Sequence, residues 1–543
     1  MHLTGLRRLA GVGLLAMFAL GTAYAAEVTS GTLADGTPWR IDYPENWNGT
    51  LLVSLDYAPN GGASATNLEL QARGFATSGV SRGITGWSVG DAIDNHVSVV
   101  ELFTAAYGPP AYTFVNGSSL GAHTGASAIQ ARPDVFDGGV LQCGSLAGII
   151  GLWNGKADAL FVLKTLLAPG DPRYPVIDIP DDFATVTRPD WLALVEAAQA
   201  TPEGRARIAL AGVIAQLPTW SSPAKPVPTP GDYDALQEGL YDSLAGAFPP
   251  VIGQAMSSRN EINRRAGGNI SWNLGIDYAA ILAEVDNSDV VQAMYDQAGL
   301  SLADDLAALA AAERFVADPD AIRWARVQVP VNPLAVPVVT INGIGDMISP
   351  VAGQQAYEAV AGSENLRQTY TQTAGHCGFN GPEVVAAVEV LQLRADTGTW
   401  PPTDPVSMNA RAAAVNLTGT PRFIEYEPDE FARFFTFFDV PADPGPDVIV
   451  AHSSGKVHVE LTPATDAAEF AAGSIDVGSI RLAGAAPVDS RLDGNSLRVS
   501  FRARDVGNGT SESGDDIALP LTGAYVNGVP IDEEVVVRLK RRD

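Results

Sequence analysis

The chain has 543 residues, of which 46% are hydrophobic and 18% charged, so it can bury a large core and exceeds the size of one ordinary domain. Its formal net charge of −28 argues against a nucleic-acid binder, because no basic stripe is present to meet phosphates. Two cysteines are too few for a structural zinc site, and the sequence predicts neither a metal nor a cofactor.

Residues 1–25 have the pattern of a secretory signal peptide. Arg7 and Arg8 form a positive start, an apolar run covers residues 9–20, and Ala-Tyr-Ala at 23–25 resembles a cleavage site. No later stretch is long and apolar enough to span a bilayer. We therefore expect a mature protein that is secreted or periplasmic, without integral membrane association.

Residues 26–145 predict the first part of an α/β domain. Segments rich in β-forming residues cover 39–42, 50–55 and 74–80, and helical spacing of apolar residues covers 91–107. Strands that alternate with helices at such intervals imply a largely parallel sheet.

The stretch 111–125 begins as a buried strand, turns at GSSLG (117–121) and continues as a helix of small residues. Strand, tight turn and helix are the context of a nucleophile elbow, which holds a serine hydroxyl clear of the sheet edge. Two other G-x-S-x-G matches surround Ser81 and Ser88, but the first lacks the following helix and the second lacks the preceding strand. The context therefore predicts Ser119 as a nucleophile.

From residue 146 to residue 328 the strand signal disappears. The helices predicted there cover 191–200, 204–216, 233–247, 278–285 and 302–316. So long a helical insertion in a sheet domain is typical of a cap over the active site, and a separate helical domain is the alternative. The apolar start of this segment, which includes Trp153, is either part of an acyl or aromatic pocket or ordinary helix packing.

The sheet domain resumes over residues 329–440. Its predicted elements are strands at 335–342 and 366–371 and helices at 354–360 and 383–394, with 422–426 as its margin. A Pro-rich linker follows at 441–446, and short alternating runs over 446–543 predict a small β-sandwich. The sequence assigns this β-module no partner.

A serine hydroxyl needs a base to take its proton and a third group to hold that base. Five of the six histidines are poorly placed, because they lie in the signal peptide, in or beside the β-module, mid-helix, or one helical turn after Ser119: His2, His452, His458, His96 and His123. His376 remains, in a glycine-flanked loop after a predicted strand. The order Ser…Asp…His then predicts Asp346 as the third member, with Asp318 or Asp320 as the fallback.

An oxyanion hole requires backbone N–H donors aimed at the developing negative charge. One donor should be Leu120, which follows the nucleophile. The other should come from the turn after the strand 50–55, and is therefore Tyr57 or Asp56.

With these residues in place, the chain resembles secreted α/β-hydrolases of the serine esterase type from about residue 44 to residue 377. The matching stretches are PENWNGTLLVSLDYAP, ARGFATSGVSRGITGW, VNGSSLGAH, FDGGVLQCG and GHCG. The resemblance implies an α/β-hydrolase sheet with a large helical cap. The family usually carries His-Gly where this chain has Asp56-Tyr57, so these side chains are expected to extend into the predicted substrate site. The position of Tyr57 in the turn after the strand 50–55 keeps it as the expected second oxyanion donor. The family also usually has glycine at the position of Ala122.

The pair His376-Cys377 is similar to the tannase and feruloyl-esterase group, in which a cysteine beside the catalytic histidine is disulfide-bonded near the nucleophile. The resemblance is partial, because Ser118 precedes the nucleophile here. Cys143 ends the strand that follows the elbow helix, so its loop could meet the histidine loop. We therefore expect a Cys143–Cys377 disulfide.

The sequence as a whole predicts an exported serine hydrolase that cleaves carboxylic esters, small or polymeric, through an acyl-enzyme. A serine peptidase of the same fold is one alternative, with an acidic cap residue such as Glu261 binding the substrate amine. A non-catalytic protein that attaches to a surface or polymer through the β-module is the other.

Overall fold

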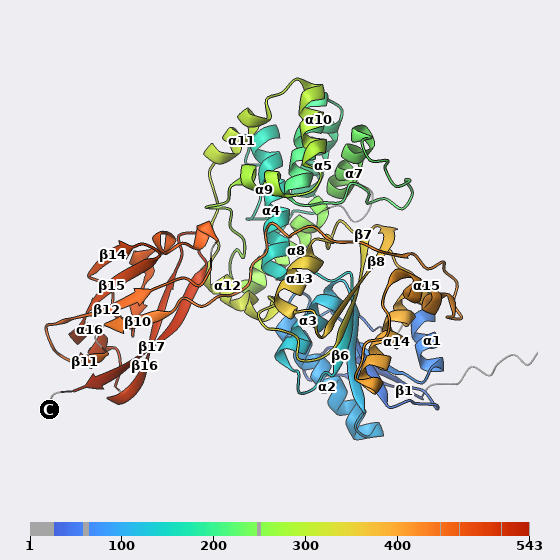
Figure 1. Ribbon diagram of the computed structural model, residues 1–543, viewed down its shortest axis with the longest axis horizontal. Coiled ribbons are helices and arrows are strands. Elements are labelled where there is room, and N and C mark those ends of the chain that lie inside the picture. The colour runs from blue at the N-terminus through green and yellow to red at the C-terminus, as the bar shows by residue number, and fades with distance from the viewer. Residues whose placement is uncertain are drawn as a thin grey trace, which may run out of the picture.

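The structure is a computed structural model that describes residues 27–57, 64–246, 251–445, 447–465, 467–511 and 513–541. The signal peptide predicted at 1–25 lies outside these residues. No helix among them is both long and apolar enough to cross a bilayer. Figure 1 shows a sheet domain with a group of helices above it and a smaller β-domain, in red, that contains the C-terminal end.

A nine-stranded sheet in the order β1-β2-β4-β3-β5-β6-β7-β8-β9 forms the centre of the larger body. Its six strands from β4 to β8 are mutually parallel, whereas β1, β2 and β9 are antiparallel additions at the two edges. The strands are β1 Glu27–Thr32, β2 Pro38–Tyr43, β3 Thr50–Leu55, β4 Ala76–Val80, β5 Tyr112–Ser118, β6 Gly138–Gln142, β7 Val338–Gly345, β8 Leu366–Ala374 and β9 Phe423–Ile424.

Helices cover both faces of this sheet, which explains why its central strands are buried almost throughout. Successive side chains of a strand point to opposite faces, so Leu51 and Val53 belong to one hydrophobic cluster and Leu52 to the other. The helices of the sheet domain are α1 Ala65–Ala72, α2 Val89–Tyr107, α3 Leu120–Ala131, α13 Gly353–Ala361, α14 Gly381–Thr397 and α15 Pro405–Ala413. Figure 1 shows α1, α14 and α15 on one side of the sheet and α2, α3 and α13 on the other.

The predicted helical insertion forms a cap over the sheet (Figure 1). It leaves the sheet after β6 and returns before β7, and these two strands pair directly, so the whole insertion rises from one point of the sheet edge. Its helices are α4 Gly148–Leu167, α5 Thr187–Gln199, α6 Pro202–Ile214, α7 Tyr233–Ala245, α8 Val251–Ala266, α9 Tyr278–Glu284, α10 Ser288–Ala298, α11 Leu302–Ala311, α12 Pro319–Ala325 and the 3₁₀ turn η1 Arg326–Gln328.

An ion pair inside the cap connects it with the chain segment that follows the sheet. The Arg433 guanidinium contacts the Asp158 carboxylate at 2.5 Å and donates to the Trp272 carbonyl oxygen at 2.7 Å. Asp158 lies on α4, whose residues are buried almost without exception. The polar groups of this buried pair therefore satisfy one another inside an otherwise apolar helix layer.

The C-terminal domain is a sandwich of two four-stranded sheets, β10-β12-β15-β14 and β11-β17-β16-β13. Its elements are β10 Ala442–Gly445, β11 Val448–Val450, β12 Lys456–Leu461, 3₁₀ turns at Ala468–Phe470, Ala472–Ser474 and Val477–Ser479, β13 Arg481–Leu482, β14 Asp489–Asp493, β15 Ser496–Arg502, α16 Ala503–Asn508, β16 Gly514–Ala524 and β17 Pro530–Lys540. The linker predicted at 441–446 is corrected here: residues 442–445 form β10 and pair with β12, because the extended backbone that proline favours also suits an edge strand.

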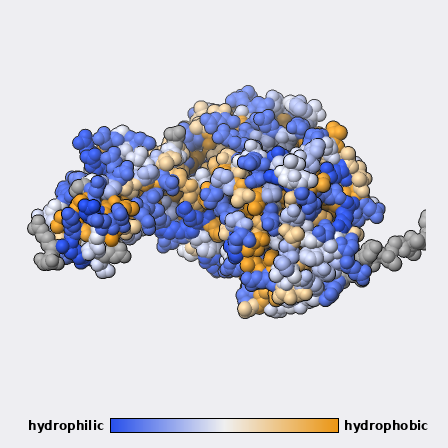
Figure 2. All heavy atoms as spheres, turned by 60° about the horizontal axis from the view of Figure 1, so that its bottom comes forward, coloured by the Kyte–Doolittle hydropathy of each residue, from blue (hydrophilic) through white to orange (hydrophobic). Residues whose placement is uncertain are grey.

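The sandwich contacts the cap near α12. Arg323 donates to both carboxylate oxygens of Asp532, at 2.7 and 2.9 Å, and the Ala317 N–H donates to the Asn527 carbonyl oxygen at 2.8 Å. Figure 2 shows a largely hydrophilic surface with an apolar strip across the larger body, consistent with the strongly acidic composition.

Candidate active site

The turn at Ser119 has the strained geometry that a nucleophile elbow requires. Ser119 lies between β5 and α3 with φ 56° and ψ −122°, a conformation that L-residues rarely adopt. Gly117 permits this turn, since a Cβ atom there would lie 2.4 Å from the backbone carbon and oxygen of Gly121. A side chain at position 117 would therefore not fit, and the turn places the Ser119 side chain beyond the end of β5.

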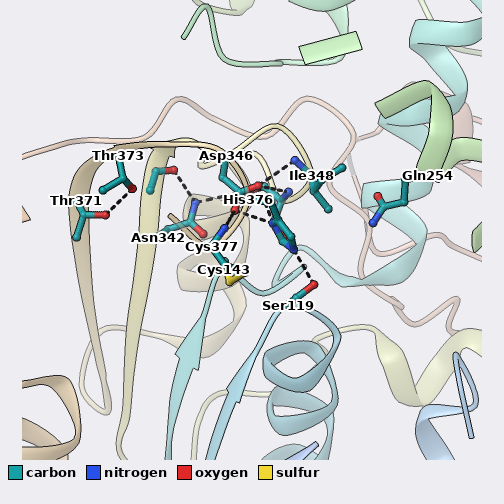
Figure 3. Close-up of polar contacts among 12 residues, drawn as sticks. Ser119, Cys143, Gln254, Asn342, Asp346, Ile348, Thr371, Thr373, His376 and Cys377 are labelled. Atoms are coloured by element: carbon teal, nitrogen blue, oxygen red, sulfur yellow. Dashed lines mark hydrogen bonds and ion pairs between the residues drawn. A yellow bond between two sulfur atoms is a disulfide. The ribbon is translucent and has the colours of Figure 1, made fainter. Parts of the chain in front are cut away.

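Three predicted side chains meet at this turn (Figure 3). His376 Nε2 lies 2.7 Å from Ser119 Oγ, and His376 Nδ1 lies 2.9 Å from each carboxylate oxygen of Asp346. A carboxylate only accepts, so Nδ1 carries the proton and Nε2 is free to accept from the serine hydroxyl. The three groups form one hydrogen-bonded chain in which the imidazole of His376 can accept the proton of the Ser119 hydroxyl.

The topology explains how residues so far apart in sequence meet. Ser119 follows β5, Asp346 follows β7 and His376 follows β8, and the carboxyl ends of parallel strands lie at one edge of the sheet. The fallback residues lie elsewhere: Asp318 accepts from the Asn269 N–H at 3.1 Å, and Asp320 pairs with an arginine on its own helix.

Asp346 is held by the backbone around it. Its side chain has no exposed surface, and its carboxylate accepts from the N–H groups of Ile348 at 2.9 Å, Ser349 at 3.0 Å and Cys377 at 3.1 Å. His376 retains 15% of its side-chain surface, so the imidazole is reachable while the carboxylate is not. The arrangement fixes the ring orientation and leaves its outer nitrogen for chemistry.

The predicted disulfide is present. Cys143 lies directly after β6 and Cys377 beside His376, and their sulfur atoms are bonded with Cα atoms 5.3 Å apart. The bond ties the histidine loop to the neighbouring strand end. These two cysteines form, with Asp346 and His376, a group of four potential metal ligands whose atoms lie within 4.8 Å of one another. The sulfurs are bonded to each other and the imidazole to the carboxylate, so none of the four is a free ligand here.

The predicted oxyanion donors differ in how they lie. Leu120 is the first residue of α3, and the N–H groups of a first helical turn have no acceptor within the helix. The Tyr57 side chain points away into the core, where its hydroxyl contacts Asp42 and lies 2.7 Å from Thr77 Oγ1. Burial raises the pKa of Tyr57, so the phenol stays neutral.

The residues predicted to line a pocket are already engaged with other groups. Asp56 has φ 64° and pairs with the Arg82 guanidinium beyond the ends of β3 and β4. Trp153, on α4, is buried and packs edge-on against the Trp87 ring, with centroids 5.9 Å apart. The acidic cap residue Glu261, suggested for a peptide amine, binds an arginine one turn away on α8 at 2.8 Å.

Among the residues that the structure describes, the imidazoles of the other two histidines of the sheet domain make no hydrogen bond to Ser119. His123 is buried and bonded to the Ser145 carbonyl oxygen at 3.1 Å and to Gln328 at 3.3 Å, and burial lowers its pKa. His96 is buried in α2, and the same cause lowers its pKa to about 4. Both are neutral core residues, as their positions in helices indicated.

Sequence reasoning missed one charged group near this site, Lys156 on α4. It is 2% exposed, and its ammonium contacts the side-chain oxygen of Gln254 on α8. Burial lowers the pKa of Lys156 to about 7, with Arg259 acting in the same direction and the Asp346 carboxylate in the opposite one. A single lysine inside the apolar run GIIGLWNGKADALFVL was the signal that could have revealed it.

No family model matches the chain. Solved structures with a similar fold include feruloyl esterase B from Aspergillus oryzae (15% identity, 69% of this chain and 80% of that one, TM-score 0.31) and Est1E from Butyrivibrio proteoclasticus (10%, 68% and 98%, 0.30). A puromycin hydrolase is 14% identical over 70% of this chain and 41% of its own, with a TM-score of 0.31.

A curated relative is much more similar in sequence. The o-phthalyl amidase of Xanthobacter agilis is 30% identical over 444 residues, which cover 76% of this chain and 96% of the relative. The protein is a hydrolase of the α/β-hydrolase fold, and it belongs to the same family as this o-phthalyl amidase.

Proposed function

We propose that the protein is an exported serine hydrolase that cleaves esters or amides of carboxylic acids through an acyl-enzyme. The observation that carries this proposal is the chain of hydrogen bonds from Ser119 through His376 to Asp346. Export is supported by the signal-peptide pattern of residues 1–25 and by the disulfide, because such bonds persist in oxidising compartments.

In the first half-reaction, Ser119 Oγ attacks the carbonyl carbon while its proton moves to His376 Nε2. The buried Asp346 carboxylate stabilises the imidazolium that results. The tetrahedral oxygen takes its negative charge toward the N–H of Leu120 and a second N–H at Tyr57. When the carbon–oxygen or carbon–nitrogen bond breaks, His376 returns the proton to the leaving alcohol or amine.

In the second half-reaction, a water molecule replaces the leaving group. His376 Nε2 takes a proton from this water as its oxygen attacks the acyl carbon, and the proton then returns to Ser119 Oγ as the acid leaves. The same three side chains therefore serve both halves, and no group beyond them has to be supplied for the proton transfers.

The leaving group can be an amine as well as an alcohol. The curated relative is named for the cleavage of o-phthalyl amides, and an o-phthalyl group is a benzoyl group with a second carboxyl carbon in the ortho position. We propose amides alongside the esters expected from the sequence. Glu261, the cap residue suggested for a substrate amine, is paired with Arg265, so the peptidase alternative stays a prediction without an acidic residue assigned to that amine.

The test is the Ser119→Ala variant, compared with Ser81→Ala as a matched control from another G-x-S-x-G segment. We expect Ser119→Ala to lose turnover of short p-nitrophenyl esters and covalent labelling by a fluorophosphonate, while Ser81→Ala retains both. Unchanged turnover in Ser119→Ala would refute the mechanism. Absence of labelling and turnover in the folded wild-type protein would favour the non-catalytic alternative.

A further inference from the structure

Lys156 is a buried cation without an anionic partner. Among the residues that the structure describes, its ammonium has no carboxylate within ion-pair distance, and its hydrogen-bond partner is the neutral side-chain amide of Gln254. Its Nζ also lies 4.6 Å from the centre of the Trp153 ring. Burying an ammonium with only a neutral acceptor and a ring face is unfavourable, so such a group is expected to have a use.

This cation lies close to the predicted catalytic group. The Asp346 carboxylate at the sheet edge raises the pKa of Lys156 and so partly offsets the effect of burial. Figure 3 shows Gln254 on a cap helix at the height of Asp346, with its side chain directed toward the site. Gln254 is only half-buried, so the amide lies between the buried ammonium and more accessible space.

The groups around Lys156 suit a second function of the substrate. A carboxylate oxygen could replace the Gln254 side-chain oxygen on the ammonium, and the Gln254 NH₂ could then donate to the other carboxylate oxygen. Arg259, fully buried on α8 with its Nη2 bonded to the Trp153 carbonyl oxygen at 2.7 Å, adds a second positive charge nearby. Trp153 and Trp87 provide an aromatic wall beside the cation.

We propose that Lys156 and Gln254 bind a carboxylate carried by the acyl part of the substrate. Resting on the proposed serine hydrolase mechanism, this assigns the substrate class as half-amides and half-esters of dicarboxylic acids, with the free carboxylate held under the cap while the other carbonyl meets Ser119. Lys156 is then a specificity-determining residue, and it takes no part in the proton transfers.

The consequence for pH can be worked out from the surroundings of Lys156. The ammonium contacts Gln254 on α8 and the Trp153 ring on its own helix. Of the neighbouring charges, the Asp346 carboxylate at the sheet edge raises its pKa and Arg259 on α8 lowers it. Its pKa of about 7 means that the binding charge is present below pH 7 and is lost above it. A bound carboxylate favours the charged form, so binding above pH 7 takes up a proton, and KM rises up to about tenfold per pH unit there.

The experiment compares 2-carboxybenzanilide with benzanilide, by the aniline released between pH 6 and 9. We expect the wild-type protein to prefer the carboxylate substrate by about 10- to 100-fold in kcat/KM at pH 6.5, chiefly through KM. Lys156→Met should remove this preference, so that 2-carboxybenzanilide and benzanilide are cleaved with similar kcat/KM. Lys164→Met, on the same helix at its last turn, is the matched control and should keep the preference.

The outcomes separate the two proposals. Turnover that is unchanged in Ser119→Ala on every substrate would refute the serine hydrolase mechanism itself. Ser119-dependent ester hydrolysis without any preference for 2-carboxybenzanilide, or a preference that survives in Lys156→Met, would overturn the carboxylate site alone. If Lys156→Met does not fold, the wild-type pH profile decides: KM must rise above pH 7 for the carboxylate substrate and not for benzanilide. Both substrates depend on His376 in the same way, so this dependence cancels in the ratio of their KM values.

Discussion

Asparagine in place of Asp346 perturbs the hydrogen-bonded chain with very little change in shape. The carboxylate has no exposed surface, and both of its oxygens lie 2.9 Å from His376 Nδ1. Its Oδ1 also accepts from the N–H groups of Ile348 and Ser349, and its Oδ2 from the N–H of Cys377. Every donor around this side chain therefore points at it.

An asparagine has one oxygen for these donors. If its oxygen stays with Ile348 and Ser349, its NH₂ group faces the N–H of Cys377 and the Nδ1–H of His376, and donors oppose donors. The imidazole relieves this conflict by moving its proton to Nε2, where it can no longer accept from the serine. We expect kcat/KM to fall about 10³- to 10⁴-fold, which corresponds to about 4–5.5 kcal/mol.

The assay is the initial rate of p-nitrophenyl acetate hydrolysis, with the melting temperature as a check on folding. Asp320→Asn is the matched control, because Asp320 is the exposed fallback residue on α12 and should leave the rate unchanged. A folded Asp346→Asn protein whose rate stays within tenfold of the wild type would show that the carboxylate does not orient His376, and the mechanism would need another partner for the ring.

Three further changes test the supports of the site. Gly117→Ala should lower the free energy of unfolding by about 1–3 kcal/mol and should also lower activity, because its Cβ would overlap the backbone of the following helix. Gly90→Ala has open space and should change neither urea unfolding nor the reaction rate. Reduction of the disulfide at Cys377 should lower the urea midpoint by an amount equivalent to about 2–5 kcal/mol and slow turnover, and identical curves with and without reductant would contradict this. Asp158→Asn leaves the buried Arg433 without its counter-charge and should destabilise the protein by about 3–5 kcal/mol; a loss below 1 kcal/mol in the same unfolding assay would show that the pair is dispensable.

The site was largely predictable because its chemistry restricts residue types. A nucleophilic serine needs a glycine-lined turn, a histidine and an acid, and a chain with six histidines leaves few combinations. Ser119 was predicted from its strand–turn–helix context, His376 by elimination and Asp346 from the order of the three residues in the chain, and the structure brings them within hydrogen-bond distance. Their catalytic role stays a prediction until the variants are measured.

The parts that escaped prediction share a physical reason. α4 is buried on almost all sides, so its apolar residues show no helical spacing, and only the apolar run around Lys156 could have indicated that this lysine is buried. β1 at the sheet edge is mostly exposed, and β10 was hidden in a Pro-rich stretch, so neither has the hydrophobic alternation of a half-buried strand. What these elements do depends on partners far away in the chain, which sequence spacing alone cannot supply.

The two sulfur atoms stand on either side of the cap in the chain, 234 residues apart. The bond cannot close until the second cysteine has been made and the two halves of the sheet have come together around everything between them. Reducing conditions inside a cell would therefore leave the histidine loop without its covalent tie. If the protein is exported as proposed, oxidation after export would complete this tie, and full hydrolytic activity would then arise only outside the cytoplasm.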